Sequence, residues 1–237
     1  TVFGDIAKLR GLLPQNTATR FVAMAIWGKC NLAALPPAAD SGLFGLRLSF
    51  DRHEAEAALA DVAVLKAKGY AVFLQPVRLT TCYTPAQLDG LLARASALAP
   101  FAFYLVDTLG VLEPQVALAL HGRICAGLSP DVAVGFHGHN HRQLALACAL
   151  ALADAHRDRP LLLDSCLGGM GKAAGNVPTE LLLHALNRRG NAGYPPQGAL
   201  AALDALGPGA DAGGVVPWVL ASAIGCNTAY VSWLLAR

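Results

Sequence analysis

The chain has 237 residues, of which 54% are hydrophobic and 14% are charged, and its formal net charge is +2. This composition excludes a disordered or fibrous chain, and the nearly balanced charge gives no electrostatic case for nucleic-acid binding. The length suits one sizeable core and is about what a single α/β barrel requires. We therefore expect a single domain over residues 1–237.

Short apolar runs alternate with longer amphipathic runs along the chain, which is typical of repeated βα units around a parallel sheet. The opening residues resemble a helix, and residues from about 190 to 237 form an irregular excursion followed by a C-terminal helical extension. The strands are expected at 20–25, 44–50, 71–76, 101–106, 132–137 and 160–164, and the helices between and after them at 54–68, 84–98, 114–126, 141–155 and 178–187. Six such strands fit either an open doubly wound sheet or a barrel that lacks two strands, and periodicity alone does not distinguish them.

The location of the protein is predicted from its cysteines and its apolar C-terminus. Its six cysteines are scattered without a CxxC pair, which is typical of reduced thiols in a reducing compartment, so we expect a cytoplasmic protein. The run from Gly213 to Ala236 has no charged residue and is long enough to cross a bilayer. Its proline, serine, asparagine and threonine residues favour buried C-terminal helices instead, so no membrane segment is expected.

The strongest candidate site lies in the segment VAVGFHGHNH, residues 132–141. Residues two apart on a strand face the same side, so His137 and His139 are expected to point together from the strand's C-terminal end. Barrel enzymes place their sites at that end, and two imidazoles so placed are natural ligands for a divalent metal. The alternative is that they only hydrogen-bond to neighbours. Asn140 and His141 are expected to cap the next helix or to lie behind the ligands.

A glycine-rich segment between the sixth strand and the helix near Pro178 is a second candidate. The backbone N–H groups of such a loop can hold an anion, and Lys172 could add a positive charge over a carboxylate or phosphate. Asn176 could bind a metal through its amide oxygen or merely cap a turn. A turn needed only for its geometry explains the same glycines.

Asp107 and Thr108 end the fourth expected strand, at the same rim. A carboxylate there could hold the second ring nitrogen of a metal-bound histidine. It could equally cap the next turn or helix, and the sequence favours neither role.

The segments DT-LG, H-x-H-N and GMG-x-x-AGN-x-x-TE, in this order, resemble the metal-dependent lyase and aldolase superfamily of TIM barrels. This superfamily includes 4-hydroxy-2-oxovalerate aldolase, 3-hydroxy-3-methylglutaryl-CoA lyase and the isopropylmalate and homocitrate synthases, and the likeness is greatest to bacterial aldolase catalytic domain proteins. It covers residues 1–187 in element order and is sharpest over residues 106–183. The resemblance implies a (β/α)8 barrel in which the first strand of this chain corresponds to the family's third.

The resemblance also implies an activity and a cofactor. It implies that His137, His139 and Asn176 bind a divalent metal, Mn²⁺ first, with Mg²⁺, Zn²⁺ or Co²⁺ as alternatives. The reaction would be a lyase or aldolase cleavage of a carbon–carbon bond in a small 2-oxo acid, with the cation stabilising an enolate. By the same resemblance a homodimer is expected. Three other side chains are candidate catalytic groups: Asp107, Lys172 and Arg47.

Arg47 matches an arginine on the family's fourth strand, which either forms a structural pair or holds a substrate carboxylate. The chain departs from the family elsewhere. No segment matches the first-strand Asp-Arg-Glu motif, whose aspartate binds the metal, and we expect that an N-terminal portion is missing from this sequence rather than lost. Cys226 stands where 4-hydroxy-2-oxovalerate aldolases carry a catalytic tyrosine, and Tyr230 matches a second tyrosine, so the acid–base role does not transfer. The lyase's loop cysteine is absent, and Cys166 is expected to be a buried thiol.

Three alternatives stay open. The pattern Gly169-x-Gly171-x-x-Ala174 fits a dinucleotide-binding loop, although no strand ending in an acidic residue follows and Asp204 lies in a helical run. A non-catalytic barrel would bind a ligand or partner without turnover. An acyl-CoA-dependent Claisen-type synthase of the same superfamily would require an acetyl-CoA site, and no segment is identifiable as one.

Overall fold

The computed structural model describes residues 6–14, 18–155, 159–190, 193–207, 217–218, 221 and 225–235. The chain divides into two compact units. The first unit comprises Thr1–Thr108, Ala119–Phe136 and Arg157–Leu162, and the second comprises Leu109–Leu118, His137–His156 and Leu163–Arg237. The single domain expected from the sequence stays a prediction.

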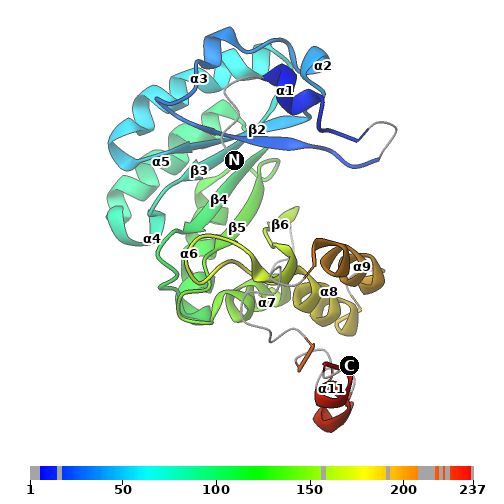
Figure 1. Ribbon diagram of the computed structural model, residues 1–237. Coiled ribbons are helices and arrows are strands. Elements are labelled where there is room, and N and C mark those ends of the chain that lie inside the picture. The colour runs from blue at the N-terminus through cyan, green and yellow to red at the C-terminus, as the bar shows by residue number, and fades with distance from the viewer. Residues whose placement is uncertain are drawn as a thin grey trace. The chain divides into compact units, whose positions relative to one another are not determined.

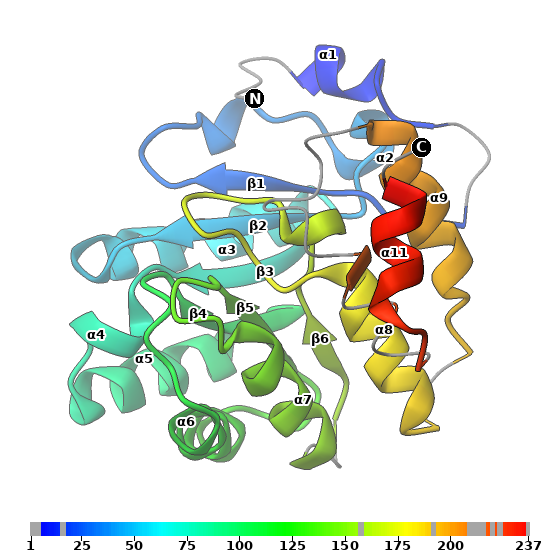
Figure 2. The ribbon, with the colours of Figure 1, turned by 60° about the horizontal axis from the view of Figure 1, so that its bottom comes forward.

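Six strands form one sheet in the order in which they occur along the chain (Figures 1 and 2). They are β1 (Val22–Ile26), β2 (Gly45–Phe50), β3 (Ala71–Pro76), β4 (Ala102–Asp107), β5 (Ala133–Gly138) and β6 (Leu161–Leu163). All six expected strands are confirmed. A doubly wound sheet reverses its strand order near the middle, whereas a barrel keeps neighbouring strands sequential. The observed order therefore confirms a barrel-type fold and excludes the doubly wound alternative.

Helices follow the strands as the apolar periodicity predicts. They are α1 (Ile6–Arg10), α2 (Ala38–Ser41), α3 (Ala55–Ala67), α4 (Leu79–Cys82), α5 (Pro85–Leu98), α6 (Pro114–Gly127), α7 (Ala145–Ala155), α8 (Thr179–Arg188), α9 (Pro196–Leu206) and α11 (Thr228–Leu235), with short 3₁₀ turns η1 (Leu32–Ala34), η2 (Arg52–Glu54) and η3 (Leu167–Gly169). The five helices expected between residues 54 and 187 are confirmed. The Thr84-Pro85 start is a capping box, because Thr84 Oγ1 accepts from the N–H of Gln87 at 3.3 Å while Gln87 Oε1 accepts from the N–H of Thr84 at 3.0 Å.

Helix α7 begins four residues later than the sequence pattern predicts. Asn140 Oδ1 accepts a hydrogen bond from the N–H of Ala145 at 3.2 Å, and the Asn140 carbonyl accepts one from the N–H of Gln143 at 3.0 Å. Gln143 has a φ of 59°, which interrupts the helical backbone before α7. The capping role expected of Asn140 is confirmed, and the turn that it closes displaces the helix start.

The first unit contains the paired strands β1 to β4, which are parallel. The register places Arg47 opposite Phe73, so these side chains share one face of the sheet, and alternation puts Tyr104 on the same face. Helices α3 and α5 contact each other, and α3 packs on β2 and β3 (Figure 2). A buried apolar cluster on the Tyr104 face is formed by Phe73, Ala102, Tyr104, Val106 and Ala133.

Gly135 is required by the packing of this cluster. A Cβ atom at Gly135 would lie 2.4 Å from the ring of Tyr104, which is 4% exposed. We expect Gly135→Ala to destabilise the protein by ~1–3 kcal/mol, because the buried ring has to shift. Urea-induced unfolding measures the change. The control is Gly122→Ala in α6, where no atom lies within 4 Å of the added Cβ, and which should stabilise by about 0.5–1 kcal/mol. A Gly135→Ala protein as stable as the parent would contradict the packing of Tyr104 on Gly135.

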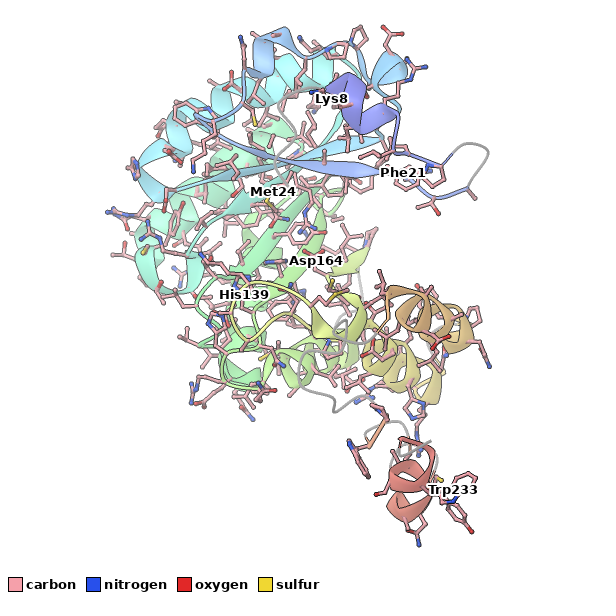
Figure 3. All side chains as sticks on the ribbon, viewed as in Figure 1. Lys8, Phe21, Met24, His139, Asp164 and Trp233 are labelled. Atoms are coloured by element: carbon pink, nitrogen blue, oxygen red, sulfur yellow. The ribbon has the colours of Figure 1, made fainter. Side chains whose placement is uncertain are left out.

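The C-terminal run from Gly213 to Ala236 lies partly outside the described residues. Within it, α11 buries Val231 but leaves Tyr230 66% exposed and Trp233 53% exposed. Trp233 is labelled in Figure 3. The expected burial of this helix is thus only partial. None of the helices in the described ranges has the length and apolar character needed to cross a membrane.

Candidate metal centre

The candidate site lies in the second unit and begins at the C-terminal end of β5. His137 is the last residue but one of β5, and His139, which is labelled in Figure 3, directly follows the strand. Their ring centroids are 5.2 Å apart with an interplanar angle of 78°. The His139 ring also stacks on His141 at 5.4 Å. The expected proximity of His137 and His139 is therefore present, while metal binding by them stays a prediction.

Asp164 holds His137 in one tautomer. The Nδ1 atom of His137 lies 2.8 Å from Asp164 Oδ2, and both side chains are largely buried. An ionised carboxylate can only accept, so Nδ1 carries the hydrogen. In the neutral imidazole the other nitrogen, Nε2, then has a lone pair available to a cation. A carboxylate behind a histidine is the arrangement that orients metal-binding imidazoles in proteins.

Asn176 lies beside His139 through the backbone. The two residues form an isolated antiparallel bridge, and the N–H of Asn140 donates to the Gly175 carbonyl at 2.8 Å. Opposite residues of an antiparallel pair have Cβ atoms about 4.5–5.5 Å apart. The Nδ2 group of Asn176 donates to the Met170 carbonyl at 3.0 Å. Its Oδ1 atom is buried and has no hydrogen-bond partner among the residues that the structure describes.

A partnerless buried amide oxygen is unusual, because nearly all buried polar atoms have a partner. A divalent cation would supply one. Within the described ranges no group of three His, Cys, Asp or Glu side chains could hold a metal. The candidate donors at this position are two imidazole nitrogens and one amide oxygen, a mixed set that suits Mn²⁺, Zn²⁺ or Co²⁺. The residues present therefore fit a divalent cation.

The glycines of the loop are needed to hold Asn176 in place. The N–H of Asn176 donates to the Gly169 carbonyl at 2.9 Å. A Cβ atom at Gly175 would lie 2.0 Å from that carbonyl oxygen, and one at Gly171 would lie 2.2 Å from Asn176 Nδ2. Gly175 also has a φ of 83°. The backbone geometry of the loop thus requires these glycines, and the same geometry places Asn176.

The other candidate residues of the loop make weaker cases. Lys172 is exposed and forms no ion pair within the described part of the chain. Its carbonyl accepts from the N–H of Gly175 at 3.1 Å. An anion-binding role for its ammonium group stays a prediction. Cys166 is half-buried, so the expected burial of its thiol is only partial, and its backbone pairs with Val177 and Thr179.

Asp107 and Arg47 belong to the first unit. Asp107 ends β4, is 3% exposed and lies 3.3 Å from the hydroxyl of Thr80. The guanidinium of Arg47 lies 4.8 Å from the centroid of the Tyr104 ring. With the Gln75 amide oxygen turned toward it, that guanidinium donates from Nε at 3.1 Å and from Nη2 at 2.8 Å. These contacts support a structural role for Arg47, and the catalytic roles of both residues stay predictions.

Sequence reasoning missed Asp164. It considered Asp107 as the carboxylate behind a metal-binding histidine, whereas the carboxylate that contacts His137 is Asp164. Both aspartates follow an apolar strand, in LVD and LLLD, so the signal was present twice. Both β4 and β6 lie beside β5 in the sheet, so the strand order does not choose between the two aspartates; the 2.8 Å contact between His137 Nδ1 and Asp164 Oδ2 does.

The dinucleotide-binding alternative lacks its structural context. Gly169 and Gly171 follow β6 and precede α8, as the pattern requires, but among the described residues no strand follows β6. Asp204 lies in α9. The acidic strand end that binds a ribose is therefore absent from the described part of the chain.

The sequential parallel βα units, with a polar cluster at the strand ends, define a barrel-type α/β domain. A sequence model of the HMGL-like family matches residues 51–206. The chain belongs to the HMGL-like family.

Two relatives are similar to this chain in sequence, and one solved structure shares its fold. The chain is 34% identical over 180 residues to the oxaloacetate decarboxylase of Mycobacterium tuberculosis (strain ATCC 25618 / H37Rv), covering 73% of this chain and 51% of the relative. It is 26% identical over 189 residues to the 4-hydroxy-2-oxovalerate aldolase of Alkalilimnicola ehrlichii (strain ATCC BAA-1101 / DSM 17681 / MLHE-1), covering 78% and 53%. The chain thus spans about half the length of these curated relatives. The hydroxymethylglutaryl-CoA lyase structure from Pseudomonas aeruginosa has the same fold, with a TM-score of 0.72, 20% identity and coverage of 90% of this chain and 79% of that one.

Proposed function

We propose that this chain carries the metal-binding part of a divalent-metal-dependent carbon–carbon lyase or aldolase that acts on a 2-oxo acid. One observation carries the proposal: His137, with Nδ1 bound to Asp164, adjoins His139, which is bridged to Asn176 and its partnerless Oδ1 atom. The family supports it, since relatives are named 4-hydroxy-2-oxovalerate aldolase and oxaloacetate decarboxylase.

His137 Nε2, a ring nitrogen of His139 and Asn176 Oδ1 would hold the cation, Mn²⁺ first, with Mg²⁺, Zn²⁺ or Co²⁺ as alternatives. When bound, such a cation polarises a carbonyl oxygen and stabilises negative charge that develops there. Asp164 keeps His137 in the tautomer that presents Nε2. Lys172, on the exposed loop, supplies a positive charge for a substrate carboxylate. A role for Asp107 is proposed from its place at a strand end, and one for Arg47 from the resemblance. A homodimer is proposed from the resemblance, and a cytoplasmic location from the scattered cysteines.

Two carbon–carbon cleavages are compatible with this site, and the relatives favour testing both. Aldol cleavage follows from the aldolase relatives. Decarboxylation of oxaloacetate follows from the relative with 34% identity. In each reaction, one of the two atoms of the bond that breaks is the carbon beside the 2-oxo group. Polarisation of the same carbonyl therefore serves both reactions.

The test is pyruvate release from oxaloacetate and from 4-hydroxy-2-oxovalerate, coupled to lactate dehydrogenase. With Mn²⁺ present, we expect pyruvate from at least one substrate, and its loss when EDTA removes the metal. Free Mn²⁺ itself promotes decarboxylation of oxaloacetate, so the background is the His137→Ala/His139→Ala protein at the same Mn²⁺ concentration. Mn²⁺ binding without turnover would indicate a non-catalytic barrel. Thiol release from acetyl-CoA in the presence of a 2-oxo acid would indicate the Claisen-type alternative.

A further inference from the structure

Glu180, in the first turn of α8, has a fully buried side chain with 0% exposure. Its Oε2 atom accepts a hydrogen bond from the N–H of Gly168 at 3.1 Å. Its Oε1 atom is buried and lacks a hydrogen-bond partner within the described residues. An acidic residue in a first turn interacts favourably with the helix N-terminus without being buried. Burial of a carboxylate with a single bond is costly, so this position needs a further explanation.

The N–H group that donates to Glu180 belongs to the turn that contacts Asn176. Gly168 and Gly169 form part of η3 and have φ values of 59° and 67°. Both values lie in the left-handed region, where the backbone needs glycine and is held by its contacts. The Gly169 carbonyl accepts the hydrogen bond from the N–H of Asn176 at 2.9 Å. Glu180 is thus linked to Asn176 through two consecutive glycines.

The side chain of Asn176 depends on the same turn. Its Nδ2 donates to the Met170 carbonyl, and Met170 directly follows Gly169. The Met170 N–H in turn donates to the Leu167 carbonyl at 3.1 Å. Since Nδ2 is fixed by the turn, the direction of Oδ1 is fixed with it.

We propose that Glu180 is a positioning residue: its buried carboxylate anchors the Gly168–Gly169 turn and thereby aims the amide oxygen of Asn176 at the cation. This inference rests on the proposed function. Glu180 itself is four residues from Asn176 and need not touch the cation. Its effect on the metal is exerted through the loop.

The first test is Mn²⁺ affinity by titration calorimetry on the full chain. Glu180→Ala should weaken binding by about 10–100-fold, as loss of an outer partner of a ligand typically does. Glu180→Gln keeps an oxygen that can accept from Gly168 and should recover most of the affinity. The matched control is Glu113→Ala, because Glu113 is an exposed carboxylate of the same unit that pairs with Arg142. An unchanged affinity in Glu180→Ala would overturn the proposal.

A double-mutant cycle tests whether Glu180 acts through Asn176. If it does, Glu180→Ala/Asn176→Ala should bind Mn²⁺ no more weakly than Asn176→Ala alone. Losses that simply add would show that Glu180 acts elsewhere, and would overturn the proposal.

A metal-free measurement separates this inference from the proposed function. Hydrogen exchange of the amides in residues 168–176 should accelerate in Glu180→Ala and remain slow in Glu180→Gln. If the parent chain binds no Mn²⁺, the proposed function fails while the exchange data still test the anchor. If the parent binds Mn²⁺ but loop exchange is unchanged in Glu180→Ala, the positioning role fails and the proposed function stands.

Discussion

The protein with His137→Ala and His139→Ala is expected to bind no Mn²⁺, whereas the parent should bind about one equivalent in the manner of a single mixed imidazole and oxygen site. The two rings supply both nitrogen donors of the candidate set. Asn176 Oδ1 alone is a weak neutral ligand and cannot retain the cation. Any metal-dependent pyruvate release should disappear with the metal.

Elemental analysis of dialysed protein, with Mn²⁺ titration, measures the Mn²⁺ bound by the parent and by the double variant. The matched control is His141→Ala. His141 stacks on His139, but its Nδ1 atom lies 3.0 Å from the Leu109 carbonyl and it is exposed. Its removal should change the affinity by less than about threefold, since it contributes no proposed ligand. Equal metal content in the double variant and the parent would rule out the two histidines as ligands.

Substitution of Asp164 by alanine is expected to weaken Mn²⁺ binding by about 10–100-fold, because the carboxylate fixes the tautomer and orientation of His137. Without it, Nε2 can carry the hydrogen and is then unable to bind a cation. Asp164→Asn should weaken Mn²⁺ binding by a similar factor, because an amide can present its NH₂ group to Nδ1 and so favour the wrong tautomer.

Calorimetric titration with Mn²⁺ measures both Asp164 variants. Asp154→Asn is the control, because Asp154 is an exposed carboxylate of the same unit that pairs with Arg189. Thermal unfolding of each variant shows whether the fold is retained. Parent-like affinity in Asp164→Ala would mean that the contact with His137 has no part in metal binding.

The local sequence pattern was sufficient to predict the strands and helices of this fold. Apolar runs of strand length, followed by amphipathic runs, predicted all six strands within two residues at each end. Helix signals such as Thr84-Pro85 depend on a few neighbouring residues, so they are legible without tertiary information. The start of α7 was misplaced because a turn closed by Asn140 competes with the helical pattern.

The pair His137 and His139 was also accessible from the sequence, because alternation along one strand brings residues two apart together. The residues that contact these two histidines were not accessible from the sequence. His137 meets Asp164 across 27 residues. Since β4 and β6 are both neighbours of β5, the choice between Asp107 and Asp164 depends on which side chain reaches the imidazole.

The sequence by itself therefore determined the βα order, the two imidazoles and the glycine-rich loop, since each follows from spacing within one segment. The tertiary structure alone decided that Asp164 contacts His137, that Asn176 bridges to His139 and that Glu180 accepts a hydrogen bond from Gly168 in the glycine-rich loop. The contact of His137 with Asp164 spans 27 residues and that of Gly168 with Glu180 spans 12, so neither follows from the pattern of one helix or strand. Their formation depends on strand neighbours and on the burial of polar atoms, which spacing within a segment does not specify.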